Sequence, residues 1–355
     1  MMQHGPGGSR SDNLRRSALY LAGSLLHATG AFRSLHTWLQ PGNVSILAYH
    51  GLIGSPLPVP DYCFLPVDSF ARQMDYLARH FEVVHLEEAL ARLGRSAARP
   101  LACVTFDDGF ASVHDLALPV LERFKIPAAV YLVTDFIDSD RTLWFCRLHQ
   151  AICETAASEV RLGQARFSLV GREARIRSSA GLQRALKSLH RAKFGATLED
   201  VMAQLGCAES TAQAPWEPFR ILSSDQIRRM SRDGLVRFGA HTASHQILTR
   251  TAPDDARQEI ERSVAAVAGL VDDPSHSFAY PNGGPDDFDN EAKHAVHRAG
   301  MRYAVSVIGG PVSPHSDPYA LPRYLIGDDS PARFAGLIHH ARDTARKLAE
   351  RTRLA

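Results

Sequence analysis

Two acidic residues stand side by side at the end of an apolar run in the segment VTFDDGF, residues 104–110. Asp107 and Asp108 repel each other, and the end of a buried strand suits them only if a cation lies nearby. An Asp-Asp-Gly sequence by itself is more often a simple turn. The pair therefore raises the question of which cation it serves and why two carboxylates are present.

The segment HTASH, from His241 to His245, offers an answer. It follows the apolar run LVRFGA, and if the chain turns helical there, the two imidazoles share one face and can bind one cation. Alone, such a pair is often only an exposed helix face. A catalytic zinc site typically has three protein ligands and an open position for water, and TFDDG offers a carboxylate as the third. The other carboxylate would stay free as a general base for that water.

Both segments follow predicted strands of an α/β chain. Apolar runs at 43–52, 99–109 and 126–136 alternate with helical patterns, and roughly seven such strands are expected over 43–330. Strands that are apolar on both faces indicate a mainly parallel sheet, open or closed into a barrel. Barrel active sites collect at the carboxyl ends of the strands, so the polar residues that follow different strands are expected to meet there.

The alternation stops over residues 136–222. This segment has a helical pattern, a hairpin pattern and a basic helix over 179–194, so we expect a long α+β insertion with its own structure on one connection. After the last strand, residues 331–355 are expected to form a basic helix. Together with an N-terminal helix, it would flank the barrel.

Residues 1–42 contain an Arg-Arg pair followed by a moderately apolar stretch. We interpret this segment as an amphipathic helix that packs on the domain or makes peripheral contact with a membrane; a secretory signal is the alternative. The five cysteines form no CxxC motif, which favours a reducing compartment, so we expect a cytoplasmic protein. The net charge of +2 gives no reason to expect a nucleic-acid partner.

Three motifs carry a resemblance to a known family. VTFDDGF, HTASH and FAYPNG (278–283) resemble the first three motifs of the polysaccharide deacetylases, the NodB-homology or carbohydrate esterase family 4 enzymes. The resemblance runs from about residue 46 to 327, outside the insertion. It implies a distorted (β/α)7-type barrel that removes acetyl groups from N-acetylated sugars, less often O-acetyl groups, with one divalent metal ion, Zn²⁺.

The resemblance also implies roles for single residues. The catalytic base would be Asp107, and the metal ligands would be Asp108, His241 and His245. The wall of the site, in contact with the substrate, would be formed by Tyr280, Pro281 and Asn282.

The chain departs from the family pattern at two places. Ala279 stands where the family commonly has an arginine that steadies the base. The FAYP form is similar to a subgroup from bacterial surface-polysaccharide and exopolysaccharide systems, in which the arginine of an LPR segment, here Arg323, would contact Asp107 instead. The usual final histidine, a general acid, has no clear match. His50, at the tip of the first strand, is a candidate acid or substrate contact, and equally a polar strand cap.

The predicted function is a metal-dependent deacetylase acting on an acetylated oligo- or polysaccharide of a surface polysaccharide or its precursor. Two alternatives stay open: a related hydrolase of a small non-sugar amide, and a catalytically silent barrel that binds glycan. The presence of Asp107 argues against a silent barrel, because a site that only binds needs no free base.

Overall fold

The structure, a computed structural model, describes residues 42–207 and 214–340. The predicted N-terminal helix within 1–42 therefore lies outside the described residues, and so does most of the predicted helix over 331–355. The described part of that second segment forms α12 (Pro331–Ile338). Among the described residues, no helix is long and apolar enough to cross a membrane.

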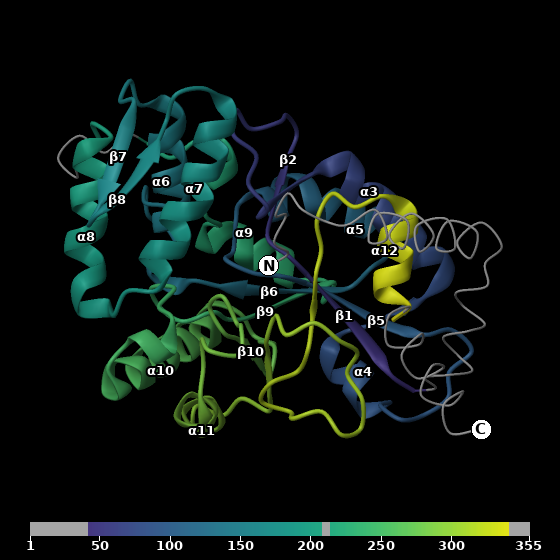
Figure 1. Ribbon diagram of the computed structural model, residues 1–355. Coiled ribbons are helices and arrows are strands. Elements are labelled where there is room, and N and C mark those ends of the chain that lie inside the picture. The colour runs from purple at the N-terminus through teal and green to yellow at the C-terminus, as the bar shows by residue number, and fades with distance from the viewer. Residues whose placement is uncertain (1–41, 208–213, 341–355) are drawn as a thin grey trace, which may run out of the picture.

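A parallel sheet curled into a distorted barrel forms the centre of the molecule (Figure 1). Its path of hydrogen-bonded strands is β11 (Tyr303–Val305), β10 (Ser277–Ala279), β9 (Val236–Ala240), β6 (Ala128–Leu132), β5 (Leu101–Phe106), β1 (Val44–Tyr49) and β12 (Tyr324–Leu325). The short strand β4 (Glu82–Val83) also pairs with β5. A parallel bridge between Val305 and Leu321 brings β11 beside the segment that leads into β12. The predicted barrel of seven strands is confirmed.

Helices cover the outer face of this sheet. They are α3 (Val67–His80), α4 (Leu86–Ala91), α5 (Leu118–Phe124), α9 (Ser224–Ser231), α10 (Pro253–Leu270), α11 (Asn290–Arg298) and α12. Short helical turns lie at η1 (Val113–Ala117), η2 (Thr134–Phe136), η4 (Glu217–Phe219) and η5 (Leu248–Arg250). A small parallel pair, β2 (Gly51–Ile53) and β3 (Phe64–Pro66), lies outside the barrel.

Alternation along the strands decides which side chains enter the barrel. In β5, Val104 and Phe106 belong to the core shared with the helices, whereas Cys103 packs in the core inside the barrel. Successive strand residues point to opposite faces, so Thr105 and Asp107 share the inward direction of Cys103. The first acid of the pair therefore points into the barrel.

The connection from β6 to β9 forms a lobe beside the barrel (Figure 1). It contains α6 (Trp144–Glu154), the antiparallel pair β7 (Glu159–Leu162) and β8 (Ala165–Ser168), α7 (Arg172–Lys187) and α8 (Arg191–Gln204). The lobe has its own apolar core, which includes Leu148, Ile152, Leu182, Leu186 and Val201.

The single basic helix expected over 179–194 is wrong. The chain breaks between α7 and α8, where His190 has an extended backbone with ψ 144°. Its imidazole Nδ1 accepts a hydrogen bond from the backbone N–H of Ala192 and so caps the start of α8. A side chain that accepts from the first turn of a helix favours a new helix start over continuation.

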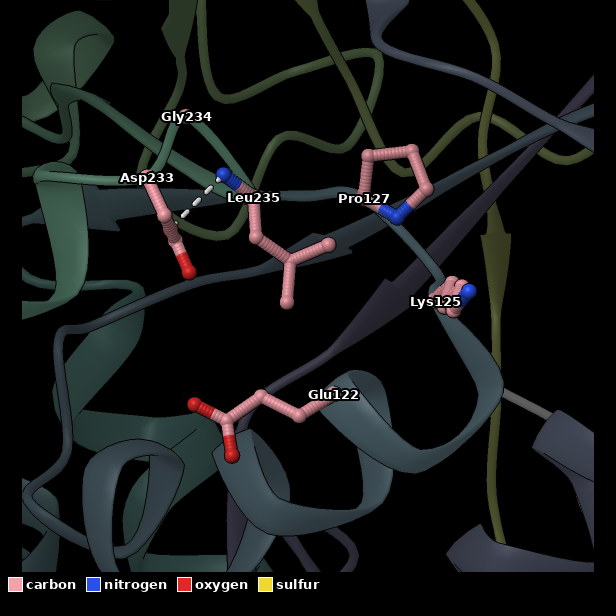
Figure 2. A pocket seen from close by; sticks show the side chains of 6 residues that line it. All are labelled: Glu122, Lys125, Pro127, Asp233, Gly234 and Leu235. Carbon is pink, nitrogen blue, oxygen red and sulfur yellow. Dashed lines mark hydrogen bonds between the residues drawn. The ribbon is translucent and has the colours of Figure 1, made fainter.

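A surface depression of about 380 Å³ lies near the amino ends of β6 and β9 (Figure 2). It is lined by Glu122, Lys125, Pro127, Asp233, Gly234 and Leu235. The acids and histidines of the motifs follow the carboxyl ends of β5 and β9, so this depression lies at the opposite end of the barrel from them.

A buried ion pair attaches the lobe to the barrel. The Nδ1 of His149, in α6, lies 3.5 Å from the Oδ2 of Asp61, in the loop between β2 and β3. Asp61 also accepts hydrogen bonds from the backbone N–H of Cys63 and from the amide of Gln183 in α7. Burial alone would lower the pKa of His149, but the contacts with Asp61 and Cys153 outweigh it and raise the pKa to about 9. The histidine is therefore charged when folded at neutral pH.

This pair predicts a loss of stability at alkaline pH. Because the pKa of His149 is raised on folding, its contribution is complete below its ordinary value near ~6.5 and is lost as the pH rises through about 9. We expect the free energy of unfolding to fall by roughly 1–3 kcal/mol across that window, measured by urea denaturation. His149→Gln should flatten this dependence, whereas the exposed control His294→Gln should not. Parallel curves for wild type and His149→Gln would contradict the assignment.

Candidate active site

Arg323 and Asp107 form a buried ion pair inside the barrel. The Nη1 and Nη2 of Arg323 donate to the two carboxylate oxygens of Asp107, each over 2.7 Å. Nη1 also donates to the hydroxyl of Thr105 over 3.0 Å, and Nε donates to the carbonyl oxygen of Ser306 over 2.8 Å. The Arg323 side chain is fully buried, and the contact with Asp107 expected from the sequence is present.

The surroundings keep Asp107 ionised. Burial by itself would raise the pKa of this carboxyl, but the guanidinium of Arg323 and the nearby His241 outweigh it, so the pKa lies below its ordinary value. A bidentate pair also fixes the plane of the carboxylate. Asp107 is thus a charged acceptor held in one orientation.

Asp108, His241 and His245 form a second buried cluster next to this pair. The Nε2 atoms of His241 and His245 lie 3.5 Å and 3.2 Å from Oδ1 of Asp108. One potential ligand atom from each residue lies within 4.8 Å of the others. Neither carboxylate oxygen of Asp108 accepts a hydrogen bond from any residue in the described ranges. A buried carboxylate that accepts no hydrogen bond and faces two imidazoles suits the binding of a divalent metal ion.

The histidines are oriented for this role. The Nδ1 of His241 donates to the carbonyl oxygen of Ala279 over 2.8 Å, which leaves Nε2 free to face Asp108. Burial lowers the pKa of His245, so its imidazole is neutral, as a metal ligand must be. Ala279 therefore contributes a backbone carbonyl to the site.

The segment HTASH is a bent loop and not the helical turn considered from the sequence. Thr242 and His245 have positive φ values of 62° and 60°, which no helix contains. Asp108 also has a positive φ, 73°. Such conformations cost about 1–3 kcal/mol each in non-glycine residues and persist only where the surroundings impose them. The two histidines converge because the loop is bent, although their spacing is that of a helix face.

Glu259 of α10 holds this loop in place. One carboxylate oxygen accepts from the backbone N–H of Ser244 and the other accepts from its hydroxyl, both over 2.7 Å. The carbonyl oxygen of Glu259 accepts from the backbone N–H of Ala243 over 3.1 Å. All three hydrogen bonds are made with Ala243 and Ser244, which lie between the two histidines in sequence, so Glu259 fixes the spacing of the imidazoles.

Glu259→Ala should therefore weaken metal binding without touching a ligand. Groups that position metal ligands typically contribute ~10-fold or more to affinity, and we expect a loss of about that size in metal titrations. Glu261→Ala is the matched control, because Glu261 lies on the same helix and pairs with Arg257 at the surface. Wild-type metal affinity in Glu259→Ala would show that the loop is held by other contacts.

His50 lies next to the contact between β1 and the acids. It follows β1 directly and is half-buried, and the carbonyl oxygen of the preceding Tyr49 accepts from the backbone N–H of Asp107 over 2.9 Å. Its ring lies 6.3 Å from the ring of Tyr62. This position is compatible with an acid or a substrate contact.

Tyr280 does not line the site with its side chain, which corrects the expectation from the sequence. It is fully buried, its ring stacks on Phe288 at 4.1 Å, and its hydroxyl donates to the carbonyl oxygen of Tyr319. The reason is strand alternation: Tyr280 shares the outward direction of Phe278, whereas Ala279 belongs to the core inside the barrel. Pro281 and Asn282 begin the turn after β10, and Asn282 has a positive φ of 57°.

Several residues at the site were missed from the sequence. Thr105 could have been found, because it shares the inward direction of Asp107 two positions away. For Phe145 of α6, an aromatic residue of the predicted insertion, what was missed is its position: its ring lies 5.6 Å from that of His245. Glu259 lies on a helix whose charged face gives no sign of a loop contact.

Comparisons with known proteins agree with this geometry. Residues 94–304, more than half of the chain, match the family described as polysaccharide deacetylase, so the chain belongs to that family. It is a hydrolase of the class that acts on carbon–nitrogen bonds other than peptide bonds. No curated protein matches the chain.

Solved structures share the fold at low sequence identity. A deacetylase, PplD, from Streptococcus pyogenes has a TM-score of 0.56 and 17% identity, with 84% of this chain and 99% of that chain covered. IcaB from Ammonifex degensii has a TM-score of 0.53 and 19% identity, with 83% and 98% covered. A de-N-acetylase from Aggregatibacter actinomycetemcomitans has a TM-score of 0.50 and 14% identity, with 81% and 96% covered.

Proposed function

We propose that this protein is a metal-dependent deacetylase that hydrolyses N-acetyl groups on sugars of a surface polysaccharide or its precursor, with Zn²⁺ as the metal. The observation that carries the proposal is the division of the two adjacent acids. Asp107 is locked onto Arg323, whereas Asp108 faces two imidazoles and accepts no hydrogen bond from the described residues. Two carboxylates with such different partners suit two different tasks.

The roles follow from these partners. Asp108, His241 and His245 would hold the metal ion, which when bound supplies a Lewis acid for the acetyl carbonyl and lowers the pKa of water. Asp107 accepts the proton of the water molecule that adds to the carbonyl carbon. The carbon–nitrogen bond then breaks, the sugar nitrogen leaves with a proton as an amine, and the acetyl group leaves as acetate.

Arg323 positions the base. Its two N–H groups hold both oxygens of Asp107, so the carboxylate cannot rotate toward the histidines and become a further ligand. His50, which follows β1 directly, is the candidate donor of the proton to the leaving nitrogen.

The nature of the substrate rests on the family and on fold relatives. The family name specifies a polysaccharide, and one relative is named a de-N-acetylase. The first alternative, hydrolysis of a small non-sugar amide, uses the same chemistry and differs only in substrate. The second alternative is a barrel that binds glycan without cleaving it. It does not explain why Asp107 is ionised and held in one orientation.

Acetate release tests the proposed function. Purified protein should release acetate from N-acetylated oligosaccharides, lose this activity after treatment with a chelator, and regain it when Zn²⁺ is added back. Asp108→Asn should bind the metal weakly and stay inactive at metal concentrations that restore the wild type. Activity that persists in full after the metal content has been shown to be zero would exclude a metal-dependent reaction. Acetate from small amides alone would favour the first alternative.

A further inference from the structure

An exposed aromatic ring with a lysine against it lies beside the candidate active site. The side chain of Tyr62, in the loop between β2 and β3, is exposed, and the residue is 58% accessible. The Nζ of Lys187, the last residue of α7, lies 5.9 Å from the centre of this ring and donates to its hydroxyl over 3.4 Å. The pair therefore joins the barrel to the lobe.

The ring of Tyr62 lies near the two acids of the site. Its centre is 6.3 Å from the centre of the His50 ring, and the residue before His50, Tyr49, accepts at its carbonyl oxygen from the backbone N–H of Asp107 over 2.9 Å. Lys187 lies against the ring of Tyr62. A sugar chain that places one unit over Asp108, His241 and His245 would thus bring a neighbouring unit onto Tyr62.

The exposure of Tyr62 is not explained by packing. It is one of four large apolar side chains exposed among the described residues, and the residue before it is anchored to the lobe. That residue is Asp61, bound to His149 and Gln183. A tyrosine ring fixed in this way offers a flat apolar face at little entropic cost, which suits stacking against a sugar ring.

Lys187 brings a positive charge that no described residue neutralises. Within the described ranges, no carboxylate lies at ion-pair distance from its ammonium, and the acid in the loop, Asp61, is buried against His149. An ammonium that donates only to a tyrosine hydroxyl among the described residues can still donate to a carboxylate. By the same charge, it repels a sugar unit that carries a protonated amine.

Building on the proposed function, we propose that Tyr62 and Lys187 form a subsite for the sugar unit beside the one that is deacetylated, and that this subsite selects an acidic sugar, a uronate. The ring stacks on Tyr62 and the carboxylate accepts from Lys187. A neighbouring unit that has already lost its acetyl group presents an ammonium to Lys187 and is disfavoured. The substrate class is thereby an acetylated polymer that contains acidic units.

The test compares one oligosaccharide with its own neutral form. A tetrasaccharide of alternating glucuronate and N-acetylglucosamine, and the same compound with its carboxylates reduced to alcohols, have the same linkages and acetyl groups. Binding to the full, metal-loaded chain is measured by calorimetry, so the result does not depend on turnover. We expect the acidic form to bind roughly 3–10-fold more tightly, and the difference to shrink at high salt.

Variants then assign the preference to the pair. Lys187→Gln should bind both forms equally, whereas Lys193→Gln, on the exposed face of α8, should keep the wild-type preference. Tyr62→Ala should weaken binding of both forms by about fivefold.

The outcomes separate this inference from the proposed function. Equal affinity of the wild type for the two forms, no measurable binding of the acidic form, or a preserved preference in Lys187→Gln would overturn the subsite. A preference for the acidic form in a protein that releases no acetate from any acetylated sugar would keep the subsite and overturn the deacetylase.

Discussion

The bidentate contact between Arg323 and Asp107 is the interaction on which the rest of the site depends. Asp107 and Asp108 are adjacent and buried, so each needs a separate source of positive charge. Arg323 supplies it for Asp107 from within the barrel. Asp108 faces the imidazoles of His241 and His245 instead, and in the proposed function the positive charge beside it is that of the metal ion. Removing one partner of such a buried pair typically costs about 3–5 kcal/mol, so the barrel interior is built around this contact.

Backbone strain is concentrated in the turns around Asp107. Asp108, Thr242, His245 and Asn282 all have positive φ values, and all lie in turns that follow barrel strands. Strain of this kind concentrates at functional sites and is sustained by contacts elsewhere. Glu259 provides such a contact for the loop of the histidines, since both its carboxylate oxygens are taken up by Ser244. In the proposed mechanism, such strained turns keep the metal ligands apart from the base.

The fold and the polar cluster could be predicted from the sequence because both depend on local patterns. Apolar runs that alternate with helical patterns predicted the parallel barrel, and the two motifs predicted which residues would meet at its carboxyl edge. The resemblance to the FAYP subgroup pointed to Arg323, because Ala279 stands where the wider family commonly has the arginine that contacts the base. Strand alternation alone would also have turned Tyr280 away from the site, since it shares the direction of Phe278.

Other features depend on contacts between distant segments and could not be predicted from local sequence patterns. The bend of HTASH is one of them, because the spacing of its two histidines equals that of a helix face. The pairing of Tyr62 with Lys187 joins a loop of the barrel to the end of a helix in the lobe, and their sequence separation gives no hint of it. The break between α7 and α8 depends on the cap at His190, in a stretch whose composition suits a continuous helix.

The central claim is that the two adjacent acids do different work, and Asp107→Asn tests it most directly. Metal content and acetate release are measured on the same folded preparation, with thermal unfolding as the check on folding. The account predicts that the variant keeps a full equivalent of metal and loses turnover by ~10²-fold or more, because the general base is gone while the ligands remain. Turnover close to that of the wild type would contradict the claim, and so would loss of the metal.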